Sequence, residues 1–381
     1  GNGPGELSGW IRPTAEAARA QARSSGRPVR LTLALLPTQF AGGAELETVR
    51  SWRLFDRIIE PATCVRLAAG LGSLETLRRG ALVHLGGDLW LSSRLAARAG
   101  LPAAAFSETL LIASRHRGFA RIFVPTGGHA AALRDRGVPS DKIVVTGDPR
   151  AAAPAEAGTL AVAAPRDDII ALLPGSRDRF FRTAGPIFLE IAAALAAIRP
   201  QMRAVVVVAP FITPDTLAAV RHPAGNGTTP PVQWLTGDPW PVLTRARFAL
   251  TLPGTSTLEL AAAGIPFAVV LPTDHVALAP VEGLLEWIAR ITGLQRPLKR
   301  AILARYRARM QFLALPNQRA GRQIAPEWIG SPAAEDLARR VDDLLNDPPA
   351  LAAMAAALSE LYAPDAAAPS RIAASAYALA G

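Results

Sequence analysis

The sequence has little of several residue types that mark common classes of protein. It has one cysteine, Cys64, in 381 residues, which excludes an intrachain disulfide scaffold and fits a reducing compartment. None of the histidines is spaced as a metal pair, and neither a His-x-x-x-His nor an Asp-x-Asp motif occurs. We therefore expect no metal ion and no other cofactor.

Long apolar runs and suitably placed aromatic residues are also scarce. No uninterrupted apolar run approaches the roughly 18 residues of a transmembrane helix, and no signal peptide is evident, so we expect a cytoplasmic protein. Aromatic residues make up 6% of the chain. They are not interleaved with basic residues as in a base-stacking platform, so nucleic acid is not an expected partner.

The positive charge comes almost wholly from arginine. The formal net charge is +10, and only Lys142 and Lys299 among the 41 basic residues are lysines. Arginine binds phosphate in a bidentate way, so phosphorylated small molecules or an anionic membrane are natural partners. Residues 287–326 include no acidic residue, and their basic residues alternate with apolar ones. This pattern predicts contact with an anionic membrane surface, the alternative being a solvated helix pair with an apolar stripe facing the core.

Strand-like apolar runs alternate with helix-like runs, which predicts an α/β protein with parallel sheets covered on both faces. The length exceeds one ordinary core, so two domains are expected. We expect a doubly wound, Rossmann-like domain over 1–155 that binds the acceptor, and a second over 156–362 that binds a nucleotide. A C-terminal helix over 363–381 could pack back on the first domain. Residues 151–167, rich in Ala, Pro and Gly, are interpreted as the interdomain linker.

The glycine-rich segment Gly1–Trp10 is predicted to be a loop that leads into a helix over Ile11–Ser24. Such a loop normally follows a strand, so we expect that a first strand is missing or lies upstream. Glu6 and Ser8 could bind a sugar or a phosphorylated acceptor there, the alternative being that they cap the helix.

Two turns rich in glycine and hydroxyl side chains, Leu172–Arg177 and Pro253–Glu259, suggest a ligand site. Each follows an apolar run and leads into a helix-like run, and a helix N-terminus favours an anion. We predict that the pair holds a diphosphate, with glycine allowing its close approach and Arg177 supplying charge. Glu259 could face a ribose diol. The alternatives are a turn with a solvated arginine and a carboxylate that only complements the helix dipole.

Asp88 follows the strand-like run Ala81–Leu85 after two glycines. A carboxylate at that sheet edge suits a general base that takes a proton from a sugar hydroxyl. The alternative is an N-cap for a helix over Leu89–Ala99.

Together these motifs resemble the lipid-A-disaccharide synthase family of GT-B glycosyltransferases. The resemblance is most specific over about 169–360 and weaker over 1–150. The sequence departs from the family pattern at Trp10, over Ala103–Ile112 and at Asp148, all in the half expected to bind the acceptor. The resemblance rests on Gly5–Gly9, Leu172–Arg177, Gly254–Glu259 and the run formed by Leu315-Pro316-Asn317, Ala320-Gly321-Arg322 and Pro326-Glu327.

The resemblance implies a GT-B fold, two Rossmann-like domains with a cleft between them. It also implies inverting, metal-independent transfer of a glucosamine, acylated or not, from a UDP-sugar to a lipid-linked or phosphorylated sugar acceptor at the cytoplasmic membrane face. A homodimer is a further expectation. The catalytic residues would be Asp88, Glu6 and Arg177, and acceptor binding would involve Gly5 and Ser8. The donor would be held by Gly175, Ser176, Arg177, Gly254, Thr255, Ser256, Thr257, Glu259, Asn317 and Arg322.

Two other readings of the same residues stay open. One is a UDP-sugar 2-epimerase-like enzyme on the same architecture, which needs no acceptor. The other is a non-catalytic protein that binds a sugar nucleotide.

Overall fold

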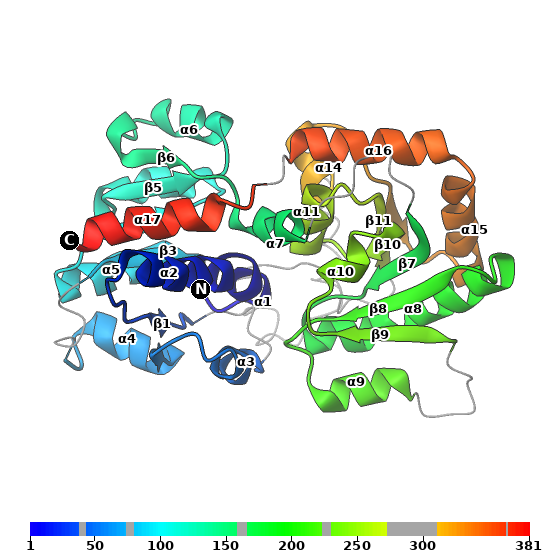
Figure 1. The fold of residues 1–381 in the computed structure, drawn as a ribbon, viewed down its shortest axis with the longest axis horizontal. Helices are drawn as coiled ribbons and strands as arrows, with labels where there is room; N and C mark the ends of the chain where they lie inside the picture. Colours follow the sequence, from blue (N-terminus) through cyan, green and yellow to red (C-terminus); the bar gives the residue numbers. More distant parts are fainter. Residues whose placement is uncertain (38–42, 74–79, 158–165, 223–229, 273–310, 363–364) are drawn as a thin grey trace, which may run out of the picture. The chain divides into compact units, whose positions relative to one another are not determined.

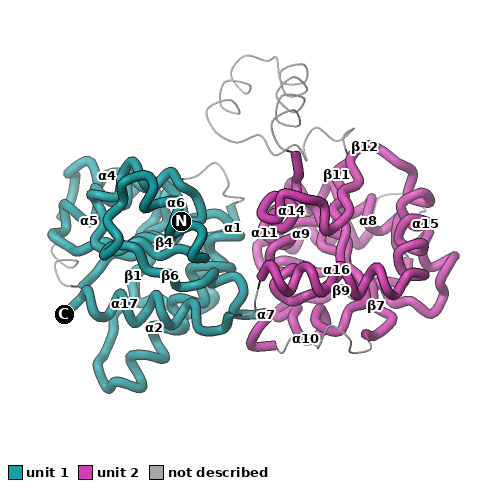
Figure 2. Tube along the Cα trace, turned by 90° about the horizontal axis from the view of Figure 1, so that it is seen from above, with its two compact units in different colours: residues 1–153, 365–381 teal, residues 154–364 magenta. Residues whose placement is uncertain are grey.

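The chain forms two compact units, unit 1 of residues 1–153 and 365–381 and unit 2 of residues 154–364 (Figure 2). Each is an α/β unit built on parallel strands. The structure is a computed structural model that describes residues 1–37, 43–73, 80–157, 166–222, 230–272, 311–362 and 365–381.

Unit 1 contains a four-stranded parallel sheet in the order β3-β4-β5-β6. Every residue of β4 is buried, as expected for a strand covered on both faces. A separate parallel pair joins β1 to β2, and β2 lies in a segment where we predicted no strand. The strands are β1 Thr32–Ala34, β2 Arg57–Ile59, β3 Leu82–Leu85, β4 Ala103–Phe106, β5 Arg121–Val124 and β6 Ile143–Val145.

Helices and short 3-10 turns connect these strands. The last helix, α17 (Ala368–Ala380), lies against α2 (Arg12–Ser25) (Figure 1). The guanidinium of Arg27 donates to the Gly381 carbonyl at 2.8 Å beside this contact. The remaining helical segments are α3 Glu45–Ser51, α4 Pro61–Ala69, α5 Leu89–Ala99, η3 Leu110–Gly118, α6 Gly127–Arg134, η4 Ser140–Lys142, η5 Pro149–Ala151 and α7 Ala152–Glu156.

The predicted loop over Gly1–Trp10 is wrong, because the chain is helical from Pro4 onward. A short α-helix, α1 (Pro4–Glu6), continues through a π-helical turn, η1 (Leu7–Ile11), into α2. Pro4 occupies the first helical position, where its missing N–H costs nothing. Leu7 and Ile11 are buried four residues apart, so burial of one helix face outweighs the poor helix propensity of the glycines.

Unit 2 is built on a six-stranded parallel sheet in the order β12-β11-β10-β7-β8-β9. Along the chain, β7, β8 and β9 are added from the centre of the sheet toward one side. β10, β11 and β12 are then added toward the other side, which is the doubly wound pattern. β12 was not predicted, and all of its residues are only half-buried. The strands are β7 Asp167–Leu173, β8 Arg203–Val208, β9 Val232–Thr236, β10 Ala246–Thr251, β11 Phe267–Pro272 and β12 Glu327–Gly330.

The longest helix of unit 2, α8 (Asp178–Ile198), is long and apolar enough to cross a membrane by length and composition. Arg182 and Glu190 interrupt its apolar residues, so it is not an uninterrupted apolar run. The helix buries Phe181, Phe188 and Ile191 and packs against α15, as a core helix does. The other helices are α9 Pro214–Arg221, α10 Trp240–Leu243, α11 Thr255–Ala262, α14 Leu315–Ala320, α15 Ala334–Leu345 and α16 Pro348–Leu361.

Two predictions fall largely outside the described residues. Residues 287–310 of the basic stretch lie outside the described residues. Residues 158–165, the middle of the predicted linker, also lie outside them. The ends of that linker form α7 and the start of β7.

Candidate functional site

The two predicted turns meet at the centre of the unit 2 sheet. β7 and β10 are parallel neighbours, paired from Ile170 with Phe248 to Leu173 with Thr251. The direction in which successive strands are added to the sheet reverses between β7 and β10, because β8 lies beyond β7 on one side and β11 lies beyond β10 on the other. In open α/β sheets, ligands bind at the carboxyl ends of the strands at such a switch point. The sheet therefore brings the Leu172–Arg177 and Pro253–Glu259 turns to one edge.

The turn after β7 is shaped by Gly175. Its φ is +109°, and an added Cβ would lie 3.0 Å from the Cβ of Phe180 and 3.3 Å from Leu252 Cδ1. Only glycine fits this close, left-handed backbone. Ser176 and Arg177 are half-buried. Arg177 is the N-cap of α8, and its guanidinium lies over the Phe180 ring at 5.4 Å.

Asp178, the first residue of α8, fixes this turn to the loop after β8. Its carboxylate accepts hydrogen bonds from the Thr213 backbone N–H at 2.9 Å and from the Thr213 hydroxyl at 2.7 Å. The N-terminus of a 21-residue helix is thereby held at the switch point, where its dipole favours an anion.

The turn after β10 opens α11 with Gly254 as its N-cap. Gly254 is exposed and an added Cβ would have no neighbour within 4 Å, so space is open beside its backbone. Thr255 is half-buried, and the Ser256 hydroxyl is 2.7 Å from the Thr251 hydroxyl. Glu259 lies farther along α11 and is half-buried.

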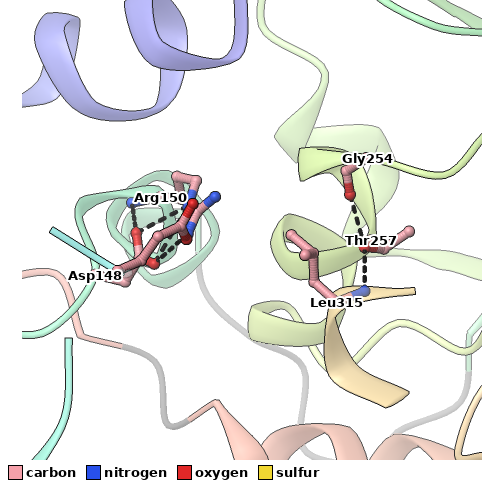
Figure 3. A network of polar contacts seen from close by, with 6 residues as sticks. Asp148, Arg150, Gly254, Thr257 and Leu315 are labelled. Atoms are coloured by element: carbon pink, nitrogen blue, oxygen red, sulfur yellow. Dashed lines mark hydrogen bonds and ion pairs between the residues drawn. The ribbon is translucent and has the colours of Figure 1, made fainter. Parts of the chain in front are cut away.

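Thr257 holds this turn together, and its hydroxyl proton is used within the protein. Its hydroxyl donates to the Gly254 carbonyl at 2.7 Å and accepts from the Leu315 N–H at 3.2 Å (Figure 3). The side chain is fully buried. Thr257 thus links the α11 turn to α14, and its predicted contact with a UDP-sugar stays a prediction.

Asn317 has a structural role within unit 2, and its predicted contact with UDP stays a prediction. Its amide nitrogen donates to the Ala325 carbonyl at 2.7 Å and to Glu327 Oε1 at 2.9 Å. Its oxygen accepts from the N–H groups of Ile324 at 2.7 Å and Ala325 at 3.0 Å. The residue is fully buried, and these four bonds use the whole capacity of an amide side chain.

Glu327 completes this scaffold, because its carboxylate also accepts from the N–H groups of Leu313 and Ala314 at 2.8–3.0 Å. The Leu-Pro-Asn…Pro-Glu run thus fixes α14 against β12. Arg322 lies after α14 and is exposed; its predicted donor contact stays a prediction.

In unit 1, Asp88 is the N-cap of α5. Its Oδ1 accepts a hydrogen bond from the Leu91 N–H at 2.7 Å. The capping alternative is therefore present in the structure, at the carboxyl end of β3.

Glu6 is a clamp between the N-terminal helix and the turn after β3, and its predicted catalytic role stays a prediction. Its carboxylate accepts from the backbone N–H groups of Asn2 at 2.9 Å, Gly3 at 3.1 Å and Gly87 at 2.9 Å. Both oxygens are therefore bound to the backbone. Through its bond to Gly87, Glu6 holds the turn that carries Asp88.

The predicted acceptor contacts of Gly5 and Ser8 lie on helical backbone and not in a loop. Gly5 is within α1, and the Ser8 hydroxyl donates to the Pro4 carbonyl at 2.9 Å. This back-bond occupies the Ser8 proton within its own helix.

A buried ionic cluster in unit 1 was not predicted. Arg150 bonds through Nη2 to Asp148 Oδ2 at 2.6 Å and through Nε to Asp148 Oδ1 at 3.0 Å (Figure 3). Its Nη2 also bonds to Glu108. Its guanidinium lies 4.9 Å from the Trp10 ring centre, and Trp10 packs on Phe106 at 5.4 Å.

Burial alone would raise the pKa of Asp148, but the charge and hydrogen bonds of Arg150 outweigh it and lower this pKa. Burial likewise opposes the charge of Arg150, yet the two carboxylates raise its pKa. The cluster joins Trp10, Glu108 and Asp148, which all lie where the sequence departs from the family pattern. Those shared departures are the one sequence feature that could have pointed to it.

The predicted site residues are thus divided between the units. Glu6 and Asp88 belong to unit 1, and the two glycine turns, Asn317 and Arg322 belong to unit 2. Within the described residues, no three His, Cys, Asp or Glu side chains are grouped so that they could hold a metal ion.

The chain is similar to curated lipid-A-disaccharide synthases. It is 33% identical over 212 residues to that of Anaeromyxobacter sp. (strain K), covering 55% of this chain and 49% of the relative. It is 31% identical over 226 residues to that of Pseudomonas fluorescens (strain Pf0-1), covering 57% and 51%. The chain thus spans about half the length of the curated relatives it matches. No protein-family model matches the sequence.

Solved structures share the architecture at low sequence identity. The UDP-GlcNAc 2-epimerase from Neisseria meningitidis, bound to UDP-GlcNAc, aligns over 96% of both chains with a TM-score of 0.54 and 13% identity. S. aureus MnaA, in a co-structure with UDP, aligns over 95% of this chain and 92% of its own with a TM-score of 0.53 and 13% identity. These likenesses confirm the predicted fold class, a GT-B type α/β fold with two Rossmann-like units.

Proposed function

We propose that the chain is a UDP-sugar-dependent glycosyltransferase. It moves a glucosamine, acylated or not, to a lipid-linked or phosphorylated sugar acceptor, with inversion and without a metal ion. The observation that carries this proposal is the placement of two glycine turns and two helix N-termini at the unit 2 switch point. The likeness to lipid-A-disaccharide synthases supports the choice of reaction.

In this proposal the donor diphosphate lies over the N-termini of α8 and α11. Gly254 leaves open space beside its backbone, and Gly175 allows the left-handed turn that packs against Phe180. Arg177 supplies a positive charge at the start of α8. Charge develops on UDP as the bond to the sugar breaks, so donors fixed in advance stabilise the transition state more than the ground state. Ser176, Thr255, Ser256 and Glu259 remain proposed donor contacts.

A lipid-linked acceptor fits two exposed apolar side chains of unit 1. Trp90 is 52% exposed and follows β3, and Leu111 is 73% exposed and follows β4. The carboxyl ends of parallel neighbours share one edge, so both lie after strands that end on the same side of the sheet. Contact with an anionic membrane through residues 287–326, on the cytoplasmic face, belongs to the same proposal.

The test combines UDP binding with UDP release. The chain should bind UDP in titration calorimetry, and it should release UDP from UDP-N-acetylglucosamine or its acylated forms only when a glycolipid acceptor is present. Arg177→Ala should lower turnover by about a hundredfold or more, the scale of losing one electrostatic stabiliser.

Arg247→Ala is the matched control. Arg247 lies near the start of β10, at the opposite edge of the same sheet, where it pairs with Asp168 at 2.8 Å. Near-normal turnover of Arg177→Ala would remove Arg177 from the mechanism, and absence of UDP binding by the wild type would contradict the proposal as a whole.

A second candidate is a UDP-sugar 2-epimerase, since the fold is shared with such an enzyme over nearly the whole chain. Because one fold hosts many functions, only the reaction that the protein catalyses distinguishes the epimerase from the glycosyltransferase. Isomerisation of UDP-N-acetylglucosamine without any acceptor, followed by proton NMR, would favour the epimerase. UDP binding without turnover under any acceptor would favour the non-catalytic sugar-nucleotide-binding protein.

A further inference from the structure

The start of α8 carries an excess of positive charge. Residues 177–182 contain three arginines and a single carboxylate, Asp178. Because the helix dipole is positive at this end, a cation there is unfavourable unless an anion lies close by. Both oxygens of Asp178 accept hydrogen bonds from Thr213, in the loop after β8. The excess charge of this turn therefore suits an anionic ligand.

Phe180 gathers two of these arginines at the turn after β7. The guanidinium of Arg177 lies 5.4 Å from the centre of the Phe180 ring, and that of Arg179 lies 4.8 Å from it. A Cβ added at Gly175 would lie 3.0 Å from Phe180 Cβ, so the same side chain packs against the glycine turn. One half-buried ring thus places two guanidinium groups beside Gly175.

The chemistry of these two groups matches a diphosphate. An aromatic ring attracts a guanidinium through its ring electrons and not through the N–H donors. Each guanidinium can bind two oxygens of one phosphate in a bidentate way. A monophosphate offers one such group, whereas a diphosphate offers two in succession. The third arginine, Arg182, is directed to α9, where its Nη2 donates to the Thr216 hydroxyl at 2.7 Å.

We propose that Arg179 is a specificity-determining residue of the unit 2 site and that, with Arg177, it selects a nucleoside diphosphate over a monophosphate. This inference rests on the proposed function, because it takes the Gly175 turn as the place where the diphosphate binds. Each arginine contacts one phosphate, so the loss of Arg179 removes one of the two contacts. All of the residues concerned belong to unit 2.

The test is titration calorimetry of the whole chain with UDP and with UMP. In the wild type, UDP should bind at least about tenfold more tightly than UMP, the scale of one charge-assisted contact. Arg179→Ala should raise the Kd for UDP by about tenfold and the Kd for UMP by much less, since one arginine remains for a single phosphate. Arg179→Lys should restore part of the preference, because it keeps the charge but loses the planar fork.

Arg182→Ala is the matched control, because it removes the same charge from the same end of α8. It should leave the ratio of the two Kd values at the wild-type figure. Arg179 and Arg182 are exposed, so both variants should keep the thermal midpoint of the wild type within about 2 °C.

A wild-type ratio in Arg179→Ala would overturn this inference alone. An equal fall of the ratio in Arg182→Ala would do the same, since it would assign the preference to the general charge of the helix end. Absence of UDP binding by the wild type would contradict the proposed function, and this inference with it.

Discussion

The carboxylate of Glu6 accepts a hydrogen bond from the backbone N–H of Gly87 at 2.9 Å, across 81 residues of sequence. This bond ties the N-terminal helix of unit 1 to the turn after β3. The turn packs closely against Glu6, because an added Cβ at Gly86 would lie 2.5 Å from the Glu6 carboxyl carbon. The two segments are therefore built around each other.

We expect Glu6→Gln to destabilise unit 1. In the wild type these backbone N–H groups donate to a carboxylate oxygen, whereas the amide of the variant would present an NH₂ group to some of them. A hydrogen bond to a charged group contributes about 1.5–3 kcal/mol. Urea denaturation should show a loss of that size in the free energy of unfolding. Glu16→Gln, at an exposed pair with Arg12, should change it by less than about 0.5 kcal/mol. Equal stability of the two variants would refute the clamp.

Gly175→Ala should weaken both the fold and UDP binding. The backbone at Gly175 has φ +109°, and the new methyl would lie 3.0 Å from Phe180 Cβ, so strain of about 1–3 kcal/mol is expected. Calorimetry should show a higher Kd for UDP. The control is Gly127→Ala in the first turn of α6, where φ is not left-handed and no atom lies within 4 Å of the new Cβ. An unchanged Kd in Gly175→Ala would place the diphosphate elsewhere.

Asn317→Ala separates a scaffold role from a ligand role. Truncation leaves two N–H groups, one carbonyl and Glu327 without their partner, and each unsatisfied buried group costs about 1–3 kcal/mol. We expect a marked fall in the thermal midpoint, measured by circular dichroism. Gln323→Ala, on an exposed residue nearby, should have almost no effect. A stable Asn317→Ala protein that has lost UDP binding would restore the ligand role.

His84 should make stability depend on pH. It is buried, its Nδ1 lies 2.7 Å from the Ser92 hydroxyl, and burial lowers its pKa from 6.5 to about 3. Between these values the unfolded chain binds the proton and the folded chain does not. Stability should therefore be full above pH 6.5 and fall by about 1.4 kcal/mol per pH unit below it.

Thermal midpoints measured from pH 7.5 to pH 5.0 should show this slope in the wild type. His84→Gln should flatten it, whereas His222→Gln, at an exposed residue of unit 2, should leave it intact. A slope that persists in His84→Gln would assign the effect to another group.

The sequence was informative where the determinants are local. The strand-like run Ala81–Leu85 corresponds to β3 (Leu82–Leu85), and the helix predicted over Ile11–Ser24 corresponds to α2 (Arg12–Ser25). Both signals are contiguous in the chain. The two turns were found because glycine, hydroxyl residues and a following helix lie together in the chain. β12 was missed, since its half-buried residues show no clear period.

What sequence reasoning missed depends on tertiary contacts. The Arg150 cluster joins residues from positions 10, 108, 148 and 150, and no local pattern links them. The motif around Asn317 was recognised, but whether a polar side chain binds a ligand or the backbone is decided by its neighbours. For Asn317, four hydrogen bonds inside the protein favour the scaffold role.

The division of unit 1 into residues 1–153 and 365–381 has a consequence for synthesis. The ribosome makes all of unit 2 before it makes α17. Unit 2 can therefore complete its sheet while unit 1 still exposes the face of α2 that α17 covers. Because α17 is made after unit 2 and covers part of unit 1, the nascent chain carries an open apolar surface for the time needed to translate about two hundred residues.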